Sequence, residues 1–224
     1  MKVLDIIYED DYILVINKPA GLAVQGGKGV KVSVDSLLSH LDRASAPLLV
    51  HRLDKDTSGA LLTAKGRQEA ARFSRFLNEK KTSKKYIAVC AGIPEKNEGI
   101  IKDELLIHGN LKKSETKYKV LESQTEPLEC SILEIELETG RMHQIRRHLA
   151  MHGNPVLGDD KYGDFKLNRE LKKNIKLKHL LLHAARLTIK GEYNLDIKAP
   201  LPEYFKKFDV TGKLKNYYES STQP

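Results

Sequence analysis

The chain has 224 residues, of which 40% are hydrophobic and 30% charged, a balance typical of a globular protein and not of a disordered one. Lys and Arg total 38 against 30 Asp and Glu, giving a formal net charge of +8 that favours a polyanionic partner. No segment approaches the roughly 20 apolar residues that a membrane-spanning helix needs, and the N-terminal stretch carries acidic residues where a signal peptide stays apolar. We therefore expect a soluble, cytoplasmic protein with no membrane partner.

The first segment, "DIIYEDDYILVINKPAG" at residues 5–21, predicts two short strands around an acidic turn, closed by the turn sequence Lys-Pro-Ala-Gly. The glycine-rich "AVQGGKGV" that follows could approach a phosphate, but it lacks the Gly-Lys-Ser/Thr of a nucleotide-binding P-loop. We therefore expect a hairpin here and no nucleoside triphosphate site.

Residues 50–65, "VHRLDKDTSGALLTAK", place several charges at the mouth of an apolar, strand-like run. Asp54 leads a tight Asp-x-x-Thr-Ser-Gly turn there, which could present a reactive carboxylate. An Asx or Ser/Thr turn that only caps the backbone would use the same residues, so the motif alone leaves both interpretations open. His51, followed by Arg52, is either a phosphate contact or a half-buried imidazole with satisfied hydrogen bonds.

A helix is predicted over residues 67–80, because apolar residues recur at helical spacing from Ala70 to Leu77, opposite basic residues. Basic residues gather twice in the chain. Residues 65–86 hold eight Lys and Arg against two Glu, and residues 166–178 hold six against Glu170 alone. Each cluster by itself fits a solvated surface as well as an RNA contact, and the two together favour nucleic acid.

Two later segments, "KYIAVCAG" at residues 85–92 and "LEIELETG" at residues 133–140, alternate as β-strands do. Tyr86 lies in the first of them beside a basic run, where its ring could stack on a base or pack against the sheet. Cys90 and Cys130 have apolar, strand-like surroundings. We expect them to be buried reduced thiols rather than a disulfide or a metal site.

A second helix is predicted over about residues 141–151. Its apolar stripe consists of Met142, Ile145 and Leu149. Arg146 falls within this stripe, and a buried guanidinium needs a carboxylate because an unpaired buried charge costs several kcal/mol or more. Asp54 is the attractive candidate, since pairing with Arg146 would keep it ionised and available as a nucleophile or base.

His148, expected to point away from that stripe, and His152 have the i, i+4 spacing of metal ligands on a helix. The residues between them lack the Glu of a zinc hydrolase, so no metal site is expected.

A polar loop at residues 154–164 and a strand at residues 179–189 complete the main elements. Strands dominate and helices interrupt them singly, which favours an α+β fold with a central mixed, mainly antiparallel β-sheet and flanking helices. The chain shows no internal repeat or flexible linker. We therefore expect residues 1–224 to form a single domain.

Together these segments resemble the RluA-type pseudouridine synthases, which isomerise uridine within ribosomal or transfer RNA. "HRLDKDTSG" is similar to their catalytic motif, "KKYIAV" to their tyrosine-bearing strand and "KKSETKYKV" to their Lys-x-x-Thr-x-Tyr segment. "TGRMHQIRRHLAMHGNPVLGDDKYG" and "LLLHAARL" resemble their arginine-bearing helix with its loop and their late strand. Order and spacing also agree, and the resemblance extends over about residues 4–205.

The resemblance implies that Asp54 is the catalytic carboxylate, that Tyr86 stacks on the target base and joins in the C5 proton transfer, and that Arg146 is the partner of Asp54. Arg52 would enter the RNA stack in place of the flipped uridine, and Leu182 would line the base pocket. Further candidate contacts to RNA or base are His51, Arg141 and His143. The family fold also implies an active-site cleft along the sheet.

The implied reaction breaks the N1–C1′ bond of uridine, rotates the base and rejoins it through C5, after the nucleotide has flipped out of its stack. Asp54 could attack C1′, take the proton at C2′ or attack C6, and the sequence leaves these routes open. The isomerisation involves neither redox change nor hydrolysis, so no cofactor or metal is expected. The expected partner is RNA, with large-subunit ribosomal RNA favoured over transfer RNA, and the expected state is a monomer.

Many members of the family carry a small RNA-binding module before the catalytic domain, and we expect it to be absent here, so that the basic clusters must grip the RNA. A different class of function, a non-catalytic RNA-binding or ribosome-assembly protein, would use those clusters equally well. A carboxylate at position 54 is a poor choice for a pocket that only holds phosphates. This favours the enzyme.

Overall fold

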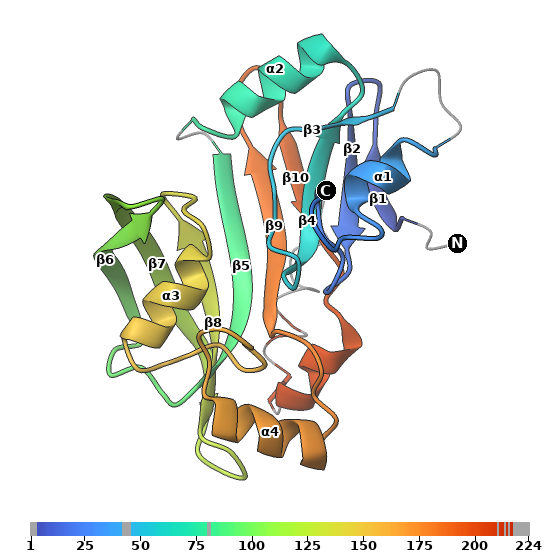
Figure 1. Ribbon diagram of the computed structural model, residues 1–224. Coiled ribbons are helices and arrows are strands. Elements are labelled where there is room, and N and C mark those ends of the chain that lie inside the picture. The colour runs from blue at the N-terminus through green and yellow to red at the C-terminus, as the bar shows by residue number, and fades with distance from the viewer. Residues whose placement is uncertain are drawn as a thin grey trace. The chain divides into compact units, whose positions relative to one another are not determined.

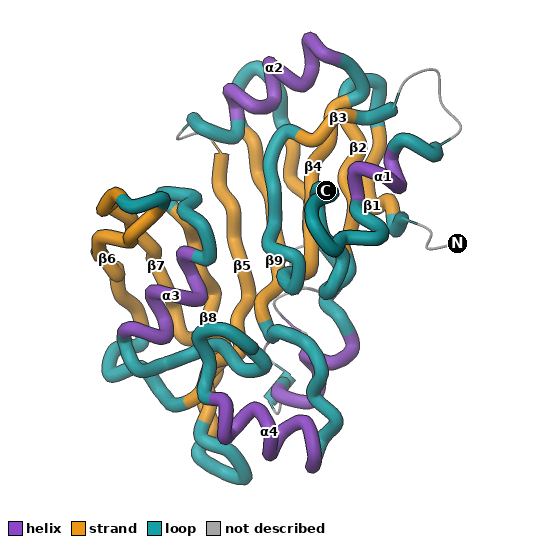
Figure 2. The backbone as a smooth tube through the Cα atoms, viewed as in Figure 1, coloured by secondary structure: helices purple, strands orange, loops and turns teal. Residues whose placement is uncertain are grey.

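The structure is a computed structural model that describes residues 4–41, 46–79 and 82–209, together with 211, 212, 214 and 216. The chain divides into two compact units, one of residues 1–84 with 183–201 and the other of residues 85–182 with 202–224. Strands form most of the regular structure, and the helices lie between them, singly except for two in succession at residues 144–151 and 165–174 (Figure 2). The expected α+β class with a mixed, mainly antiparallel sheet is confirmed. The single-domain expectation stays a prediction.

The first unit is built on strands from both ends of the chain (Figure 1). They are β1 (Ile6–Glu9), β2 (Ile13–Lys18), β3 (Leu48–Leu49), β4 (Ser58–Ala64), β9 (Leu182–Ile189) and β10 (Leu195–Lys198). Their order is β1-β2-β4-β9, with β3 pairing β4 and β10 pairing β9. The β4–β9 pair is parallel and the other pairs are antiparallel, which makes the sheet mixed. Helices α1 (Val34–Leu38) and α2 (Arg67–Phe76) complete this unit.

The parallel β4–β9 junction, where β4 begins after the Asp54 turn, needs glycine at position 59. Gly59 has φ of +111°, and a Cβ there would lie 2.3 Å from the carbonyl oxygen of Ala184. Beside it, the Oγ of Ser58 lies 2.9 Å from Nδ1 of the fully buried His183, whose Nε2 lies 3.2 Å from the carbonyl oxygen of Ala199. Because a carbonyl can only accept, His183 donates from Nε2 and accepts the Ser58 hydroxyl proton at Nδ1.

The second unit contains an antiparallel sheet in the order β5-β8-β7-β6, in which β6, β7 and β8 form a meander and β5 pairs with β8. Its strands are β5 (Thr82–Ala91), β6 (Glu98–Ile107), β7 (Asn110–Gln124) and β8 (Cys130–Leu137). Helix α3 (Gln144–Met151) packs against β6 and β7 (Figure 1), and α4 (Phe165–Asn174) and the short 3-10 helix η1 (Glu203–Phe208) follow. The β6–β7 hairpin and α4 were not among the elements expected from the sequence.

Most of the expected elements are present. The hairpin at residues 5–21 forms β1 and β2, and α2 begins at Arg67 and ends at Phe76, before the described residues break at 80–81. Cys90 and Cys130 are buried and free, as expected, and burial raises the pKa of both thiols. None of the helices in the described ranges is long and apolar enough to cross a membrane.

The second expected helix differs in two respects. It begins at Gln144 rather than near 141, because His143 adopts a left-handed conformation with φ of 52°, and Met142 of the expected apolar stripe is 46% exposed. His148, expected away from the core, is fully buried. The β6–β7 hairpin covers that side of the helix, and the Oγ of Ser114 lies 2.7 Å from Nε2 of His148.

The buried His183 and the half-buried His51 predict how the free energy of unfolding depends on pH. Burial lowers the pKa of His183 to about 4, and burial with the nearby Lys84 charge lowers that of His51 to about 3, whereas an unfolded histidine titrates near 6.5. Between these values the unfolded chain binds more protons, so the free energy of unfolding should fall as pH decreases from about 7 to 4, with each His contributing a slope of up to about 1.4 kcal/mol per pH unit.

Urea denaturation at pH 7 and pH 5 measures this effect, and His183→Gln should flatten the slope by the share of one histidine. The exposed His40 gives the matched control for the substitution, because the effect of His183→Gln on the slope should exceed that of His40→Gln. A stability that stays constant over this range would contradict the assignment of both histidines as neutral.

Candidate active site

The Asp54 turn lies in the first unit, between β3 and β4. Asp54 is half-buried, Arg52 beside it is exposed, and the backbone amide of Thr57 donates to the carbonyl oxygen of Asp54 at 3.2 Å. A main-chain turn is therefore present at Asp54, and the Asx or Ser/Thr turn considered from the sequence, which would use a side-chain oxygen, stays a prediction. Because that hydrogen bond uses only the main chain of Asp54, the turn and a chemical role for its carboxylate are compatible.

The side chain of Lys18 is hydrogen-bonded to the backbone of this turn. It is fully buried at the end of β2, and its ammonium donates to the carbonyl oxygens of Pro19 at 3.0 Å, Leu22 at 2.8 Å and Lys55 at 2.9 Å. These three bonds use all three of its protons. Burial lowers the pKa of Lys18 to about 8, although the Asp56 and Asp54 charges oppose that shift. The segment carrying Asp54 is thus tied to the loop after β2 by a buried cation that the sequence presented only as part of a turn signal.

His51 has the features of the second alternative left open by the sequence, a half-buried imidazole with a hydrogen-bond partner. Its Nε2 accepts a hydrogen bond of 2.9 Å from the backbone amide of Leu62, and its lowered pKa keeps the ring neutral near pH 7. The half-buried imidazole therefore has a structural partner on β4. Its assignment as an RNA contact stays a prediction.

In the second unit, Tyr86 lies on β5 opposite Ile135 of β8 and is 9% exposed. Leu182, the first residue of β9, is 3% exposed. Both side chains are largely buried, which is compatible with the packing interpretation of Tyr86. Base stacking by Tyr86 and lining of the base pocket by Leu182 stay predictions.

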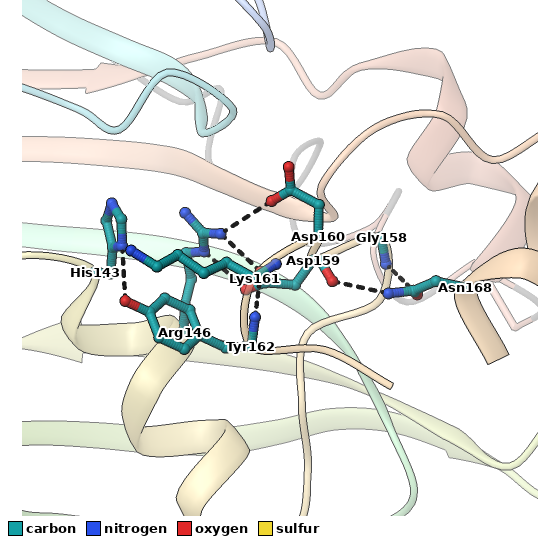
Figure 3. A network of polar contacts seen from close by, with 8 residues as sticks. All are labelled: His143, Arg146, Gly158, Asp159, Asp160, Lys161, Tyr162 and Asn168. Carbon is teal, nitrogen blue, oxygen red and sulfur yellow. Dashed lines mark hydrogen bonds and ion pairs between the residues drawn. The ribbon is translucent and has the colours of Figure 1, made fainter. Parts of the chain in front are cut away.

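Arg146 is 4% exposed on α3, which confirms the burial predicted from the helical wheel. Its guanidinium binds the carboxylate of Asp159 in a bidentate manner, from Nε to Oδ2 and from Nη2 to Oδ1, both at 2.7 Å (Figure 3). Nη2 also lies 3.5 Å from Oδ1 of Asp160. Asp54 belongs to the other unit, so its pairing with Arg146 stays a prediction. Asp159 is a carboxylate partner that the sequence did not reveal.

Asp159 is itself almost completely buried, and several donors converge on it. Besides Arg146, the backbone amides of Lys161 and Tyr162 donate to Oδ1 at 2.9 and 3.0 Å. Burial alone would raise the pKa of Asp159, but these hydrogen bonds outweigh burial and hold it below its usual value. The loop after residue 158 is thus folded around an ionised carboxylate that fixes the guanidinium of Arg146.

Tyr162 joins this network to His143. The Arg146 guanidinium lies over the Tyr162 ring, 5.2 Å from its centroid, and the Tyr162 hydroxyl lies 3.1 Å from Nδ1 of His143 (Figure 3). The left-handed backbone of His143, at the N-terminal end of α3, places its ring there. The structure therefore brings two of the sequence-predicted site residues, Arg146 and His143, into one cluster.

The start of α3 is fixed by the buried Gln144. Its side-chain amide donates to the carbonyl oxygen of Glu115 and to Thr116, while its oxygen accepts from Thr139 and from the backbone amide of Arg141. Arg141 is exposed, and its Nε lies 3.5 Å from the carbonyl oxygen of Lys113. An RNA contact by the Arg141 guanidinium is compatible with this position and stays a prediction.

The Nε2 atoms of His148 and His152 contact different residues. His148 Nε2 faces Ser114, whereas His152 Nε2 lies 2.9 Å from Oδ2 of Asp103. Within the described ranges, no three His, Cys, Asp or Glu side chains are grouped as metal ligands would be.

Comparisons with known proteins give the family. Residues 12–151 match the RNA pseudouridylate synthase family. The chain is 39% identical over 218 residues to the ribosomal large subunit pseudouridine synthase C of Rickettsia bellii, covering 90% of this chain and 70% of that protein. It is 36% identical over 215 residues to the protein of the same name from Vibrio vulnificus, covering 90% and 67%.

Comparison with solved structures agrees with this family. The human RNA pseudouridylate synthase domain containing 4 matches with a TM-score of 0.77 and 27% identity, over 94% of this chain and 93% of that one. The human domain containing 1 protein matches with a TM-score of 0.76 and 25% identity, over 99% and 97%. The chain therefore belongs to the RNA pseudouridylate synthase family, as its motifs indicated, and it is an isomerase that acts on RNA.

The buried Arg146–Asp159 pair predicts a large cost for removing one partner. Asp159→Asn keeps the side-chain size but leaves the guanidinium without its buried counter-charge, so the free energy of unfolding should fall by about 3–5 kcal/mol. Asp160→Asn is the matched control, because Asp160 is 83% exposed and its loss should cost less than about 1 kcal/mol. Urea denaturation of both variants measures the difference, and equal losses would contradict a dominant role for Asp159.

Lys18 predicts a coupled loss of stability and activity. Lys18→Met fills the same space but leaves three carbonyl oxygens without their donor, so stability should fall by about 3 kcal/mol and the catalytic rate by roughly 10- to 100-fold as the Asp54 turn loosens. The exposed Lys28 of the same unit provides the control, Lys28→Met. Denaturation and single-turnover pseudouridine formation measure the two effects. A destabilised Lys18→Met variant with an unchanged rate would contradict the positioning role.

Proposed function

We propose that this protein converts specific uridines of large-subunit ribosomal RNA to pseudouridine. The observation that carries the proposal is its similarity, over about 90% of its length, to several proteins named ribosomal large subunit pseudouridine synthase C. The motif residues Asp54, Tyr86 and Arg146 all stand in this chain at the positions that the resemblance requires.

Asp54 is the proposed catalytic carboxylate. In the isomerisation the N1–C1′ bond breaks and a C5–C1′ bond forms, while C5 loses a proton and N1 gains one, so atoms and electrons balance without a further reactant. Asp54 enters either as a nucleophile or as the base that starts glycosidic cleavage. A half-buried carboxylate on a turn fixed by Lys18 supports either role, because a preorganised group needs little rearrangement to react.

Arg146 is the proposed ionic partner of Asp54. The bidentate bond to Asp159 fixes its Nε and one hydrogen of Nη2 in a rigid orientation. A guanidinium is planar, always charged and well matched to carboxylates, which makes Arg146 a suitable partner for a catalytic carboxylate. Such a partner would favour the ionised form of Asp54 and orient it towards the ribose.

The remaining residues receive roles in binding. Tyr86 would stack on the flipped uracil and take part in the proton transfer at C5, and Leu182 would line the base pocket. Arg52, exposed on the Asp54 turn, would fill the gap that the flipped nucleotide leaves in the RNA stack. His51, Arg141 and His143 would contact the RNA or the base. We further propose a monomeric, cytoplasmic enzyme that functions as one catalytic domain without metal or cofactor.

Incubation with unmodified large-subunit ribosomal RNA transcript tests the proposal. Wild-type protein should create pseudouridines that appear as new primer-extension stops after carbodiimide treatment, and Asp54→Asn should abolish them because an amide can neither attack nor accept the proton. Asp56→Asn, two residues away on the same turn, is the matched control and should retain activity within about tenfold. Stops formed by Asp54→Asn would contradict the catalytic role, and wild-type stops confined to transfer RNA would contradict the substrate.

A further inference from the structure

A cavity of about 710 Å³ lies along α4 in the second unit, within the size range of pockets that hold small ligands. Three side chains of α4, Phe165, Arg169 and Lys172, line it, and Lys178 lines it from the segment that follows. These four residues define what we call the α4 groove. The groove combines one aromatic ring with three cations.

Phe165 is an aromatic residue that is 57% exposed. It is the first residue of α4, whose amides at positions 166 and 167 are capped by the Asp164 carboxylate, so its ring is not needed to close the helix end. An exposed aromatic ring among cations is the combination that single-stranded nucleic acid uses, because bases stack on the ring while phosphates meet the charges.

The α4 groove is continuous with the Arg146 cluster. Asp160 lines the groove, and its carboxylate lies 3.5 Å from Arg146. Asn168 of α4 donates to the carbonyl oxygen of Asp159 at 2.9 Å and accepts from the amide of Gly158 at 2.8 Å (Figure 3). Helix α4 is therefore anchored to the same loop that fixes Arg146.

The charge balance also distinguishes this surface from the other basic cluster. Residues 166–178 contain six Lys and Arg and a single acidic residue, Glu170. In residues 65–86, by contrast, Lys65 pairs with Glu9 at 2.8 Å, and Arg75 lies within 3.6 Å of Glu79 and 3.5 Å of Glu192. Residues 166–178 thus carry a formal charge of +5, which suits a polyanion.

We propose that the α4 groove binds a single-stranded segment of the substrate RNA. Phe165 stacks on one unpaired base, and Arg169, Lys172 and Lys178 contact the phosphates around it. This inference deepens the proposed function and rests on it. It gives the enzyme a second base-binding position, outside the pocket for the target uridine.

Fluorescence polarisation with a short labelled single-stranded RNA of mixed sequence tests the proposal on the full chain. Phe165→Ala should raise Kd about tenfold, Phe165→Tyr should bind like wild type because the ring is retained, and Leu111→Ala, at a 62% exposed apolar residue of β7, should have no effect. Duplex RNA of equal length should bind more weakly and be insensitive to Phe165→Ala.

The cations are tested by the neighbouring pair Lys172 and Lys173, which carry the same charge on the same helix but of which only Lys172 lines the groove. Lys172→Gln should weaken binding and reduce the slope of log Kd against log salt by about 0.7, and Lys173→Gln should change both less. Equal effects of the two substitutions on Kd and on the salt slope would indicate that RNA responds only to the overall charge, and would overturn the proposal that the α4 groove binds RNA.

Pseudouridine formation in the large-subunit transcript, measured on the same variants, separates the two proposals. Phe165-dependent RNA binding by a wild-type protein that forms no pseudouridine would support the groove and overturn the proposed function. If the wild type is active and Phe165→Ala and Lys172→Gln bind RNA with unchanged affinity, only the proposal of RNA binding by the α4 groove is overturned. The groove would then be assigned to a protein partner. Absence of RNA binding by the wild type would overturn both.

Discussion

The bidentate bond between Arg146 and Asp159 is the interaction on which the second unit's site depends. A guanidinium on the inner side of α3 can be buried only if a carboxylate accompanies it, and Asp159 meets this need with both oxygens. The loop that supplies Asp159 then has little freedom, because two of its own amides complete the carboxylate's hydrogen bonds. Tyr162, His143 and α4 are all positioned through that loop.

In the first unit a buried cation also fixes a loop, but its partners are backbone carbonyl oxygens rather than a carboxylate. There the buried cation, Lys18, donates hydrogen bonds to backbone carbonyl oxygens. One of these oxygens belongs to Lys55, next to Asp54. In both units a charged group that is costly to bury fixes a loop next to a candidate catalytic side chain, which is Asp54 in the first unit and Arg146 in the second. Rigid support of this kind is what a reaction needs when it must hold a flipped base while one bond breaks and another forms.

The sequence predicted the periodic parts of this molecule well and the loop contacts poorly. The hairpin at residues 5–21, helix α2, strand β8 and the burial of Arg146 all follow from apolar spacing, which secondary structure imposes directly. Asp159 could not be told from Asp160, because their opposite exposures depend on the course of a loop that has no period.

Some misses had a signal in the sequence. Helix α4 follows a good N-cap residue, Asp164, and has Leu167 and Leu171 at i, i+4. Its many lysines make this short apolar spacing hard to distinguish from a charged loop. The β6–β7 hairpin turns at His108 and Gly109, both with positive φ, and its absence from the expected elements made the burial of His148 unforeseeable. Lys18 is different, since its three carbonyl partners come together only in the folded chain.

The most direct test of the central claim follows the C5 hydrogen of the target uridine. Large-subunit ribosomal RNA transcribed with 5-tritiated uridine should release one tritium to water for every pseudouridine formed by the wild-type protein in a single turnover. Asp54→Asn should bind the same RNA and release none. Binding of the RNA by the wild type without tritium release would contradict the account, because the isomerisation cannot join C5 to C1′ and keep that hydrogen.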